Sequence, residues 1–235
     1  MSKHSKAHVP VKVTAHLASP LAGDSALRLD GLLEYALSLY HPKGVPGYKI
    51  TRDGPPPAPG EIPIPLRREW LGGHLVGCCS DAILEAPAAE GVEHVNKRIG
   101  VEHAGLLAPS SRLVVSTTNS WTKSYRLPLR VRVVPRVCWF AVGDRREIQR
   151  ALARHVHALG KKISIGYGRV KAWEVERTDA DWSWFAPSPA GPVLMATLPR
   201  GDWLPGGLVG WREDYGAASP PYWCVSHYAE IVAPC

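Results

Sequence analysis

The sequence predicts an α+β fold: a ferredoxin-like βαββαβ core with long loop insertions and an irregular, Trp-rich C-terminal extension. Three observations support this prediction. An alternating strand pattern is followed by a helical pattern near the start of the chain, a second strand and helix follow residue 136, and a glycine-rich loop joins that helix to a strand beginning near residue 170. With further strands between the two halves, this is the element order of one or two ferredoxin-like units with insertions.

The first strand is expected at residues 9–17, where valines alternate with polar residues at period 2. Apolar residues then recur at helical spacing from Leu29 to Tyr40, and Asp30 stands in the first turn, where the helix dipole favours an acid. Residues 42–65 hold eight prolines and predict a long loop. The short apolar run at residues 75–84 predicts a buried strand.

Residues 126–136 predict a strand with one apolar face and one arginine face. Leucine and valine occupy most odd positions, whereas arginine recurs at even positions. Pro128 and Pro135 favour an edge strand or a bulge because proline lacks the N–H that a strand donates. Another strand is expected at Arg136–Val142.

The second helix is expected between Asp144 and Gly160. Asp144 is a suitable N-cap with Glu147 three residues later, and Gly160 suits the position just after a last helical turn. Arginines fall mainly on one side of this helix. The opposite, apolar face holds Ile148, Leu152, Val156 and Leu159.

The loop after this helix reads Lys-Lys-Ile-Ser-Ile-Gly-Tyr-Gly-Arg at residues 161–169. It precedes a strand, whereas the phosphate loops of dinucleotide and NTP sites follow a strand and open a helix. Its glycines still allow a backbone to approach phosphates, and its cations supply charge. We predict RNA contact through Lys161, Lys162, Ser164 and Arg169; the alternative is an ordinary helix–strand connection.

The distribution of charge agrees with a polyanionic partner. The net charge is +7, and it divides into zero over residues 1–90, +11 over residues 91–177 and −4 over residues 178–235. A basic segment of this size is typical of nucleic-acid binding, although an arginine-rich solvated surface would give the same count. The C-terminal segment contains five of the nine tryptophans. We therefore expect an RNA-binding body at residues 1–177 and a packed extension at residues 178–235.

Aromatic residues alternate with cations and hydroxyls at residues 118–126, which suits stacking on single-stranded bases with cations at the phosphates. The alternative is a polar loop whose Trp121 fills the core. Arg67 and Arg68 beside Trp70 show a similar pattern. The RNA-binding residues predicted from these segments and the arginine face are Arg67, Arg68, Trp121, Lys123, Tyr125, Arg126, Arg130 and Arg132.

Few features indicate catalysis or a metal. We include His16, on the polar face of the first strand, among the predicted RNA-binding residues; it is also compatible with a general base, although most single histidines are neither. The five cysteines form no CxxC pair, so we expect neither a zinc site nor a disulfide framework, and no cofactor. We also expect a cytoplasmic protein, because the sequence shows no membrane-spanning run and no secretory signal.

The loop at residues 159–170 resembles the signature loop of the CRISPR-associated RAMP superfamily, whose members are RNA-binding ferredoxin-like modules. The segments His16–Pro20 and Leu29–Ala36 are similar to the subunit that caps the 5′ end of the guide RNA in type IV CRISPR effector complexes. Residues 77–83 are also similar. This resemblance refines the expected fold to a RAMP-type ferredoxin-like core, close to the RRM.

The resemblance implies a structural, non-enzymatic subunit. It would grip the 5′ handle of the guide RNA and contact the backbone and large subunits, near the place where target DNA enters. Gly166, Tyr167, Gly168 and Arg169 then become RNA-proximal by motif position. One alternative is a metal-independent endoribonuclease that recruits His16, Tyr167 and Lys161 to cut repeat RNA. Another is a duplex-binding protein, for which the sequence offers no recognition helix or zinc finger.

Overall fold

The computed structural model describes residues 8–23, 27–38, 62–98, 100, 106, 123–222 and 224–235. In this part of the chain antiparallel strands predominate and are accompanied by two α-helices, so the fold is mixed α and β as expected. Trp121 and most of the proline-rich segment at residues 42–65 lie outside the described residues. None of the helices described is long and apolar enough to cross a membrane.

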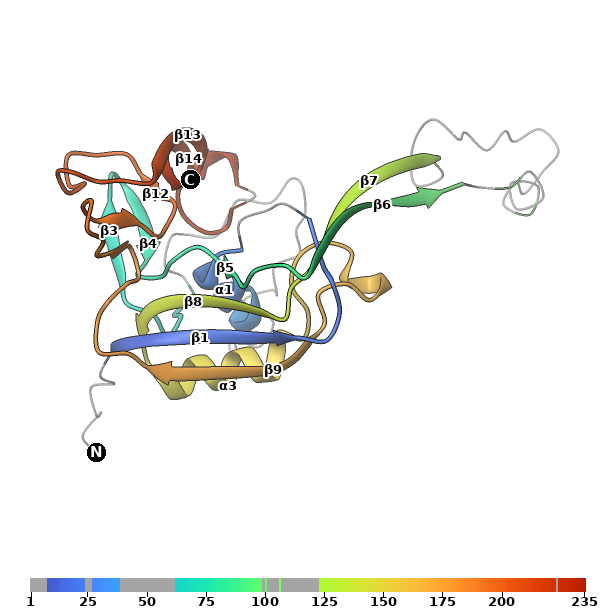
Figure 1. Cartoon of the computed structure of the whole chain (residues 1–235), viewed down its shortest axis with the longest axis horizontal. Coiled ribbons are helices and arrows are strands. Elements are labelled where there is room, and N and C mark those ends of the chain that lie inside the picture. The colour runs from blue at the N-terminus through green and yellow to red at the C-terminus, as the bar shows by residue number, and fades with distance from the viewer. Residues whose placement is uncertain are drawn as a thin grey trace.

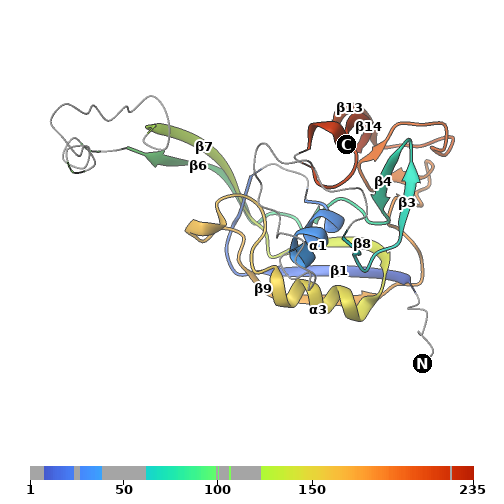
Figure 2. The ribbon, with the colours of Figure 1, turned by 180° about the vertical axis from the view of Figure 1, so that it is seen from behind.

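The main sheet has four strands, and every neighbouring pair is antiparallel. Its order is β5 (Ile83–Leu84), β8 (Arg136–Gly143), β1 (Val9–Leu17) and β9 (Val170–Arg177). The helices α1 (Leu29–Ser38) and α3 (Arg145–His155) lie on the same face of this sheet (Figures 1 and 2). The predicted period-2 strand at residues 9–17 is therefore confirmed, with its odd-numbered residues from 11 to 15 fully buried beneath the helices.

The predicted N-cap of α3 is confirmed. Oδ1 of Asp144 accepts hydrogen bonds from the backbone N–H groups of Arg146 and Glu147, at 3.0 and 3.1 Å. The carboxylate of Glu147 does not return to the Asp144 N–H, which donates to the carbonyl of Pro65. It binds Arg150 one turn later, with both oxygens 2.9 Å from Nη1.

The prediction that this helix reaches Gly160 is wrong. The helix ends at its C-cap, Val156, whose backbone is extended. The carbonyl of Val156 accepts a hydrogen bond of 2.8 Å from the indole Nε1 of Trp173, and the backbone N–H of Leu159 donates to the carbonyl of Gly168 at 2.8 Å. Pairing with the segment that leads into β9 thus replaces the last turn, and Leu159 is buried without being helical.

A long hairpin, here called the arm, projects from the main sheet (Figure 1). It consists of β6 (Ala89–Lys97) and β7 (Tyr125–Val133), with the short β2 (Leu21–Ala22) paired to the base of β7. The strand predicted at residues 126–136 therefore ends at Val133, and β8 begins at Arg136. Pro128 lies where β7 has only β6 as a neighbour, and its backbone nitrogen, which carries no hydrogen, faces the open edge. This agrees with the edge position predicted from the proline.

The apolar run at residues 75–84 forms two short strands instead of one. β4 (His74–Gly77) pairs with β3 (Arg68–Leu71), and β5 joins the main sheet after a bend. Gly77 is required where β4 passes α1, because a Cβ there would lie 2.7 Å from Cβ of Asp30.

The C-terminal extension consists of short strands and turns that pack on β4. Its sheet and hairpin strands are β10 (Phe185–Ala186), β11 (Val193–Leu194), β12 (Leu198–Pro199), β13 (Trp211–Ala217) and β14 (Tyr228–Pro234). Trp184 and Trp203 surround a small core that includes Val76 and Val232, and Nε1 of Trp184 donates to the carbonyl of Gly77 at 3.0 Å. The tryptophans described here thus serve packing between the extension and the body.

A buried ionic cluster also fastens the extension to α1. The side chains of Arg28 and Asp30 are 3% and 0% exposed and lie 3.5 Å apart. Arg28 also lies 3.5 Å from Asp81 and donates to the carbonyl of Thr197. The hydroxyl of Tyr222 donates to Asp30 at 2.8 Å, and burial raises the pKa of Tyr222 well above its ordinary value, so the hydroxyl stays a neutral donor.

Candidate nucleic-acid interface

The glycine-rich loop, residues 160–169, is fastened to the corner between β1 and β2. The backbone N–H of Lys161 donates to the carbonyl of Ala22, and that of Gly168 donates to Pro20, both at 2.8 Å. Inside the loop, residues 163–165 form a single 3-10 turn, η2 (Ile163–Ile165). This turn protrudes beside the base of the arm in both views of the ribbon (Figures 1 and 2).

Ser19 adds a side-chain connection between this corner and the loop. Its hydroxyl donates to the carbonyl of Gly166 at 2.7 Å and accepts from the backbone N–H of Arg169 at 2.9 Å. In the sequence, Ser19 stands out only as a member of the segment His16–Pro20. These two hydrogen bonds fasten the segment just after β1 to a loop that follows about 150 residues later in the chain.

Two of the loop's glycines are required by close approach. Gly168 has φ +63°, and a Cβ there would lie 1.9 Å from the carbonyl oxygen of Leu159. Gly160 has φ +79°, and its Cβ would lie 2.6 Å from the carbonyl oxygen of Ala22. Both glycines therefore give the loop its shape, which a larger residue would disrupt.

The cations of the loop lie around its base. The aliphatic part of Lys161 covers Gly23, where a Cβ would meet Cδ of the lysine at 2.9 Å. Lys162 has a left-handed backbone, and its Nζ lies 5.6 Å from the ring centroid of Tyr125 on β7, within cation–π range. Arg169 is exposed at the end of the loop. The structure thus brings Lys162 to Tyr125, with Lys161 and Arg169 elsewhere on the same loop.

Tyr167 holds the loop against the apolar face of the arm. Its ring packs on Leu129 and Val131, which are buried, and its hydroxyl donates to the carboxylate of Glu93 on β6. That hydrogen bond raises the pKa of Tyr167 above its ordinary value. Tyr167 therefore has a positioning role here that the sequence did not reveal.

The arginine face of β7 lies on the opposite side of the arm. Side chains alternate along a strand, so Arg126, Arg130 and Arg132 point away from the face that Tyr125 and Leu129 share with the loop. Arg130 pairs with Glu90, and Nη2 of Arg132 donates to the carbonyl of Gly23 at 2.8 Å. The predicted apolar face is buried at Leu129 and Val131, whereas Leu127 and Val133 on the same face are each 44% exposed. The arginines of β7 therefore lie on one face of the arm, and the glycine-rich loop with its lysines lies on the other.

Towards the tip of the arm, a shallow hollow of about 550 Å³ is lined mainly by polar and basic residues. It is lined by Asn96, Lys97, Arg98, Ser124, Tyr125 and Arg126. Lys123 is exposed next to it in the chain. The predicted pair Tyr125 and Arg126 therefore belongs to a basic end of the arm.

Three predicted residues lie elsewhere. Arg67 forms an ion pair with Glu69, and Nη1 of Arg68 donates to the carbonyl of Ile62 at 3.2 Å, so both belong to the β3–β4 side of the body. His16 lies on the face of the main sheet away from the helices, with Nε2 3.2 Å from Glu174. The structure does not bring Arg67 and Arg68 to the glycine-rich loop.

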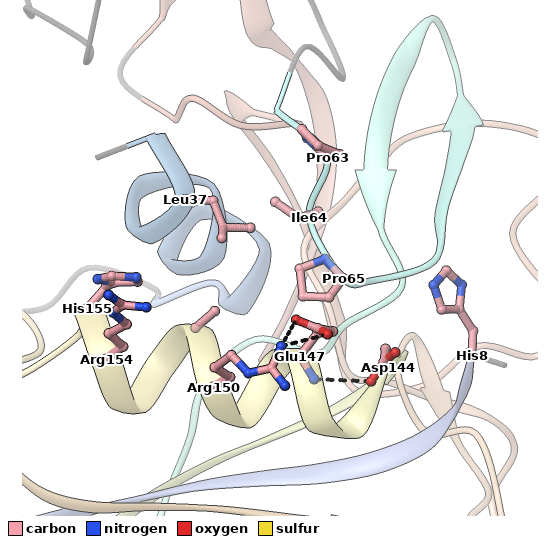
Figure 3. A pocket seen from close by; sticks show the side chains of 11 residues that line it. His8, Leu37, Pro63, Ile64, Pro65, Asp144, Glu147, Arg150, Arg154 and His155 are labelled. Carbon is pink, nitrogen blue, oxygen red and sulfur yellow. Dashed lines mark hydrogen bonds and ion pairs between the residues drawn. The ribbon is translucent and has the colours of Figure 1, made fainter. Parts of the chain in front are cut away.

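The basic side of α3 borders a separate cavity of about 320 Å³ between α1, residues 63–65 and α3 (Figure 3). Its charged groups largely compensate one another: Glu147 binds Arg150, and Asp144 caps the helix. Within the described ranges, no three histidine, cysteine or acidic side chains gather in a way that could hold a metal ion.

The comparison with known families settles the broader assignment. A family model described as CRISPR type IV associated protein Csf3 matches residues 87–234, well over half of the chain. The chain belongs to this family. A search of curated proteins finds no match.

The Csf3 match confirms the expected association with type IV CRISPR systems. The matched region contains the arm, the glycine-rich loop and the C-terminal extension. The segments His16–Pro20 and Leu29–Ala36, which resemble the 5′-capping subunit, precede it.

Proposed function

We propose that this protein is the guide-RNA-binding subunit of a type IV CRISPR ribonucleoprotein and that it grips the 5′ handle of the guide. One observation carries the proposal. A glycine-rich loop bearing Lys161, Lys162 and Arg169 is fixed by backbone hydrogen bonds beside a basic arm. Membership of the Csf3 family supplies the biological context, because it associates the chain with type IV CRISPR systems.

A RAMP-type ferredoxin-like core is part of this proposal. It is supported by the strand order β5-β8-β1-β9, with α1 between the first and second strands of the unit in chain order and α3 between the third and fourth. It is also supported by the position of the glycine-rich loop between α3 and the last strand.

The geometry suits single-stranded RNA better than a duplex. Tyr125 is 39% exposed and is flanked by Lys162. The tyrosine offers a ring for a base, and the lysine offers a cation for a phosphate. Lys161 and Arg169 extend the positive charge along the loop, and Arg130 and Arg132 supply charge on the other face of the arm. RNA that passes around the base of the arm would meet both cationic surfaces.

The proposal includes a bridging role between the backbone and large subunits, which we place on the C-terminal extension. Tyr215 and Tyr228 are 67% and 40% exposed, and their ring centroids lie 6.1 Å apart on β13 and β14. Exposed tyrosines of this kind are enriched at protein interfaces, whereas the extension's net charge of −4 disfavours phosphates. We assign this surface to another effector subunit.

The test is to assemble the effector with and without this chain and to sequence the 5′ ends of the bound RNA. We expect the 5′ handle to be protected from nuclease only when the chain is present. A Lys161→Glu/Lys162→Glu variant should lose this protection. Arg146→Glu/Arg177→Glu changes the charge equally at exposed sites away from the loop and should keep it. Equal protection with and without the chain would overturn the proposal.

A metal-independent endoribonuclease remains the second candidate, and one contact favours it: the carboxylate of Glu174 can orient the imidazole of His16. Against it, the hydroxyl of Tyr167 is engaged by Glu93, which makes Tyr167 a poorer proton donor or acceptor for RNA. Cleavage of repeat RNA in EDTA that disappears in His16→Ala would favour the enzyme over the structural subunit.

A further inference from the structure

The tip of the glycine-rich loop exposes two isoleucines. Ile163 and Ile165, at the two ends of η2, are 52% and 59% exposed. The residue between them, Ser164, is also exposed, and a Cβ built on Gly166 would have no heavy atom within 4 Å. The tip thus presents an apolar surface that contributes little to the core.

The loop that carries this tip is rigidly held. Its two ends are fixed to Ala22 and Pro20, Ser19 bonds to its middle, and Tyr167 anchors it to the arm. A wedge requires such a support, because an apolar side chain can separate two stacked bases only if its backbone does not yield.

Cations flank the two isoleucines in the sequence. Lys161 and Lys162 precede them and Arg169 follows, so phosphates on either side of the tip would be neutralised. An apolar tip between cations matches the alternation of bases and phosphates along a single strand.

We propose that Ile163 and Ile165 form a wedge that unstacks neighbouring bases of the bound RNA strand. The inference rests on the proposed function and adds a mechanical role to it. Lys161, Lys162 and Arg169 hold the backbone of the strand, and the isoleucines open the stack between the held nucleotides.

The experiment uses the full chain and a set of single-stranded RNAs with the repeat-derived 5′ sequence, each with 2-aminopurine at one successive position. Fluorescence anisotropy reports binding, and 2-aminopurine brightness reports unstacking. We expect the wild-type protein to brighten one or two adjacent positions several-fold. Ile163→Ser/Ile165→Ser should abolish the brightening and weaken binding roughly threefold to tenfold, in line with the small apolar area removed.

Val225→Ser is the matched control, because Val225 is 82% exposed on another 3-10 turn, η3 (Val225–His227), in the extension. It should brighten the same positions as the wild type. The single variants Ile163→Thr and Ile165→Thr, which keep a branched Cβ, should each give intermediate brightening and serve if the double variant does not fold.

The outcomes separate the wedge from the proposed function. Failure of the wild type to bind any of these RNAs would overturn both. Tight binding without position-specific brightening, or with brightening that the isoleucine variants retain, would overturn the wedge alone. Retained brightening together with lost association of the other effector subunits would identify the tip as a protein contact instead.

Discussion

Replacing Gly168 by alanine tests whether the shape of the glycine-rich loop supports RNA binding. Gly168 has φ +63°, and an added Cβ would lie 1.9 Å from the carbonyl oxygen of Leu159. That carbonyl belongs to the residue whose own N–H donates to the carbonyl of Gly168. The methyl group and the closing hydrogen bond of the loop are therefore incompatible, and the loop has to open.

The expected magnitude combines two effects. A left-handed backbone costs a residue with a Cβ about 1–2 kcal/mol, and the broken hydrogen bond adds about 0.5–1.5 kcal/mol. Gly207→Ala isolates the first effect, because Gly207 has a similar φ of +72° and no heavy atom within 4 Å of an added Cβ. The free energy of unfolding of Gly168→Ala should therefore be about 1 kcal/mol lower than that of Gly207→Ala, which corresponds to a Tm about 2–4 °C lower.

Thermal denaturation and RNA anisotropy measure the two consequences together. Gly168→Ala should bind single-stranded RNA on the order of tenfold more weakly, which corresponds to about 1.4 kcal/mol, whereas Gly207→Ala should bind like the wild type. Equal Tm values for the two variants would refute the steric argument. A destabilised Gly168→Ala that binds RNA normally would refute the role of the loop.

Three further predictions concern charge, the buried cluster and pH. Lys161→Met should make the log–log slope of RNA affinity against salt concentration shallower by about 0.7, the value for one phosphate contact on a single strand. Arg177→Met, at the far end of β9, should leave the slope unchanged. Equal slopes in the wild type and both variants would argue against the lysine contact. Tyr222→Phe should lower the free energy of unfolding, measured by urea denaturation, by about 1–3 kcal/mol because Asp30 loses a buried hydrogen bond. Tyr35→Phe, at a site 58% exposed, should lower it by less than about 0.5 kcal/mol. Similar losses in the two variants would contradict a stabilising role for the buried cluster. Burial, followed by the charge of Asp30, raises the pKa of Glu34 from its ordinary 4.5 to about 7. Between these two pH values the folded state holds a proton that the unfolded state has released. Glu34 therefore lowers the stability of the fold as the pH rises from about 4.5 to 7, and the loss is complete above that range. The free energy of unfolding of Glu34→Gln, measured relative to the wild type, should therefore be on the order of 2 kcal/mol higher at pH 8 than at pH 4. A difference between the two proteins that does not change with pH would rule this explanation out.

The elements that the sequence predicted well are those specified by neighbouring residues. The alternation in β1 and the cap at Asp144 depend on side chains a few positions apart, and both are found. The end of α3 depends on Trp173, which binds the carbonyl of Val156 from 17 residues away. Helical periodicity contains no information about that contact, so the helix was predicted too long.

The candidate site shows the same division. The sequence placed arginines on one face of β7 and cations in the glycine-rich loop, and both features are present. It did not show that the loop packs on the other face of β7, because this follows from the packing of Tyr167 on Leu129 and Val131. Arg67 and Arg68 had a suitable local pattern, but the fold places them at β3.

The buried cluster had almost no sequence signal. Asp30 has the character of an ordinary acid in a first helical turn, yet it is completely buried. Its partner Tyr222 lies 192 residues away. Asp81 joins the cluster through Arg28 and through Thr197, whose backbone N–H and hydroxyl both donate to its carboxylate. Only the assembled fold shows that these groups neutralise one another.

The most direct test of the central claim is photo-crosslinking of the full chain to guide RNA that carries 4-thiouridine in its 5′ handle, followed by mass spectrometry of the linked peptides. The account predicts cross-links within residues 160–169 and 123–132, on the loop and the arm. Cross-links confined to the outer face of the main sheet, around Lys12, Arg136 and Phe140, would contradict it.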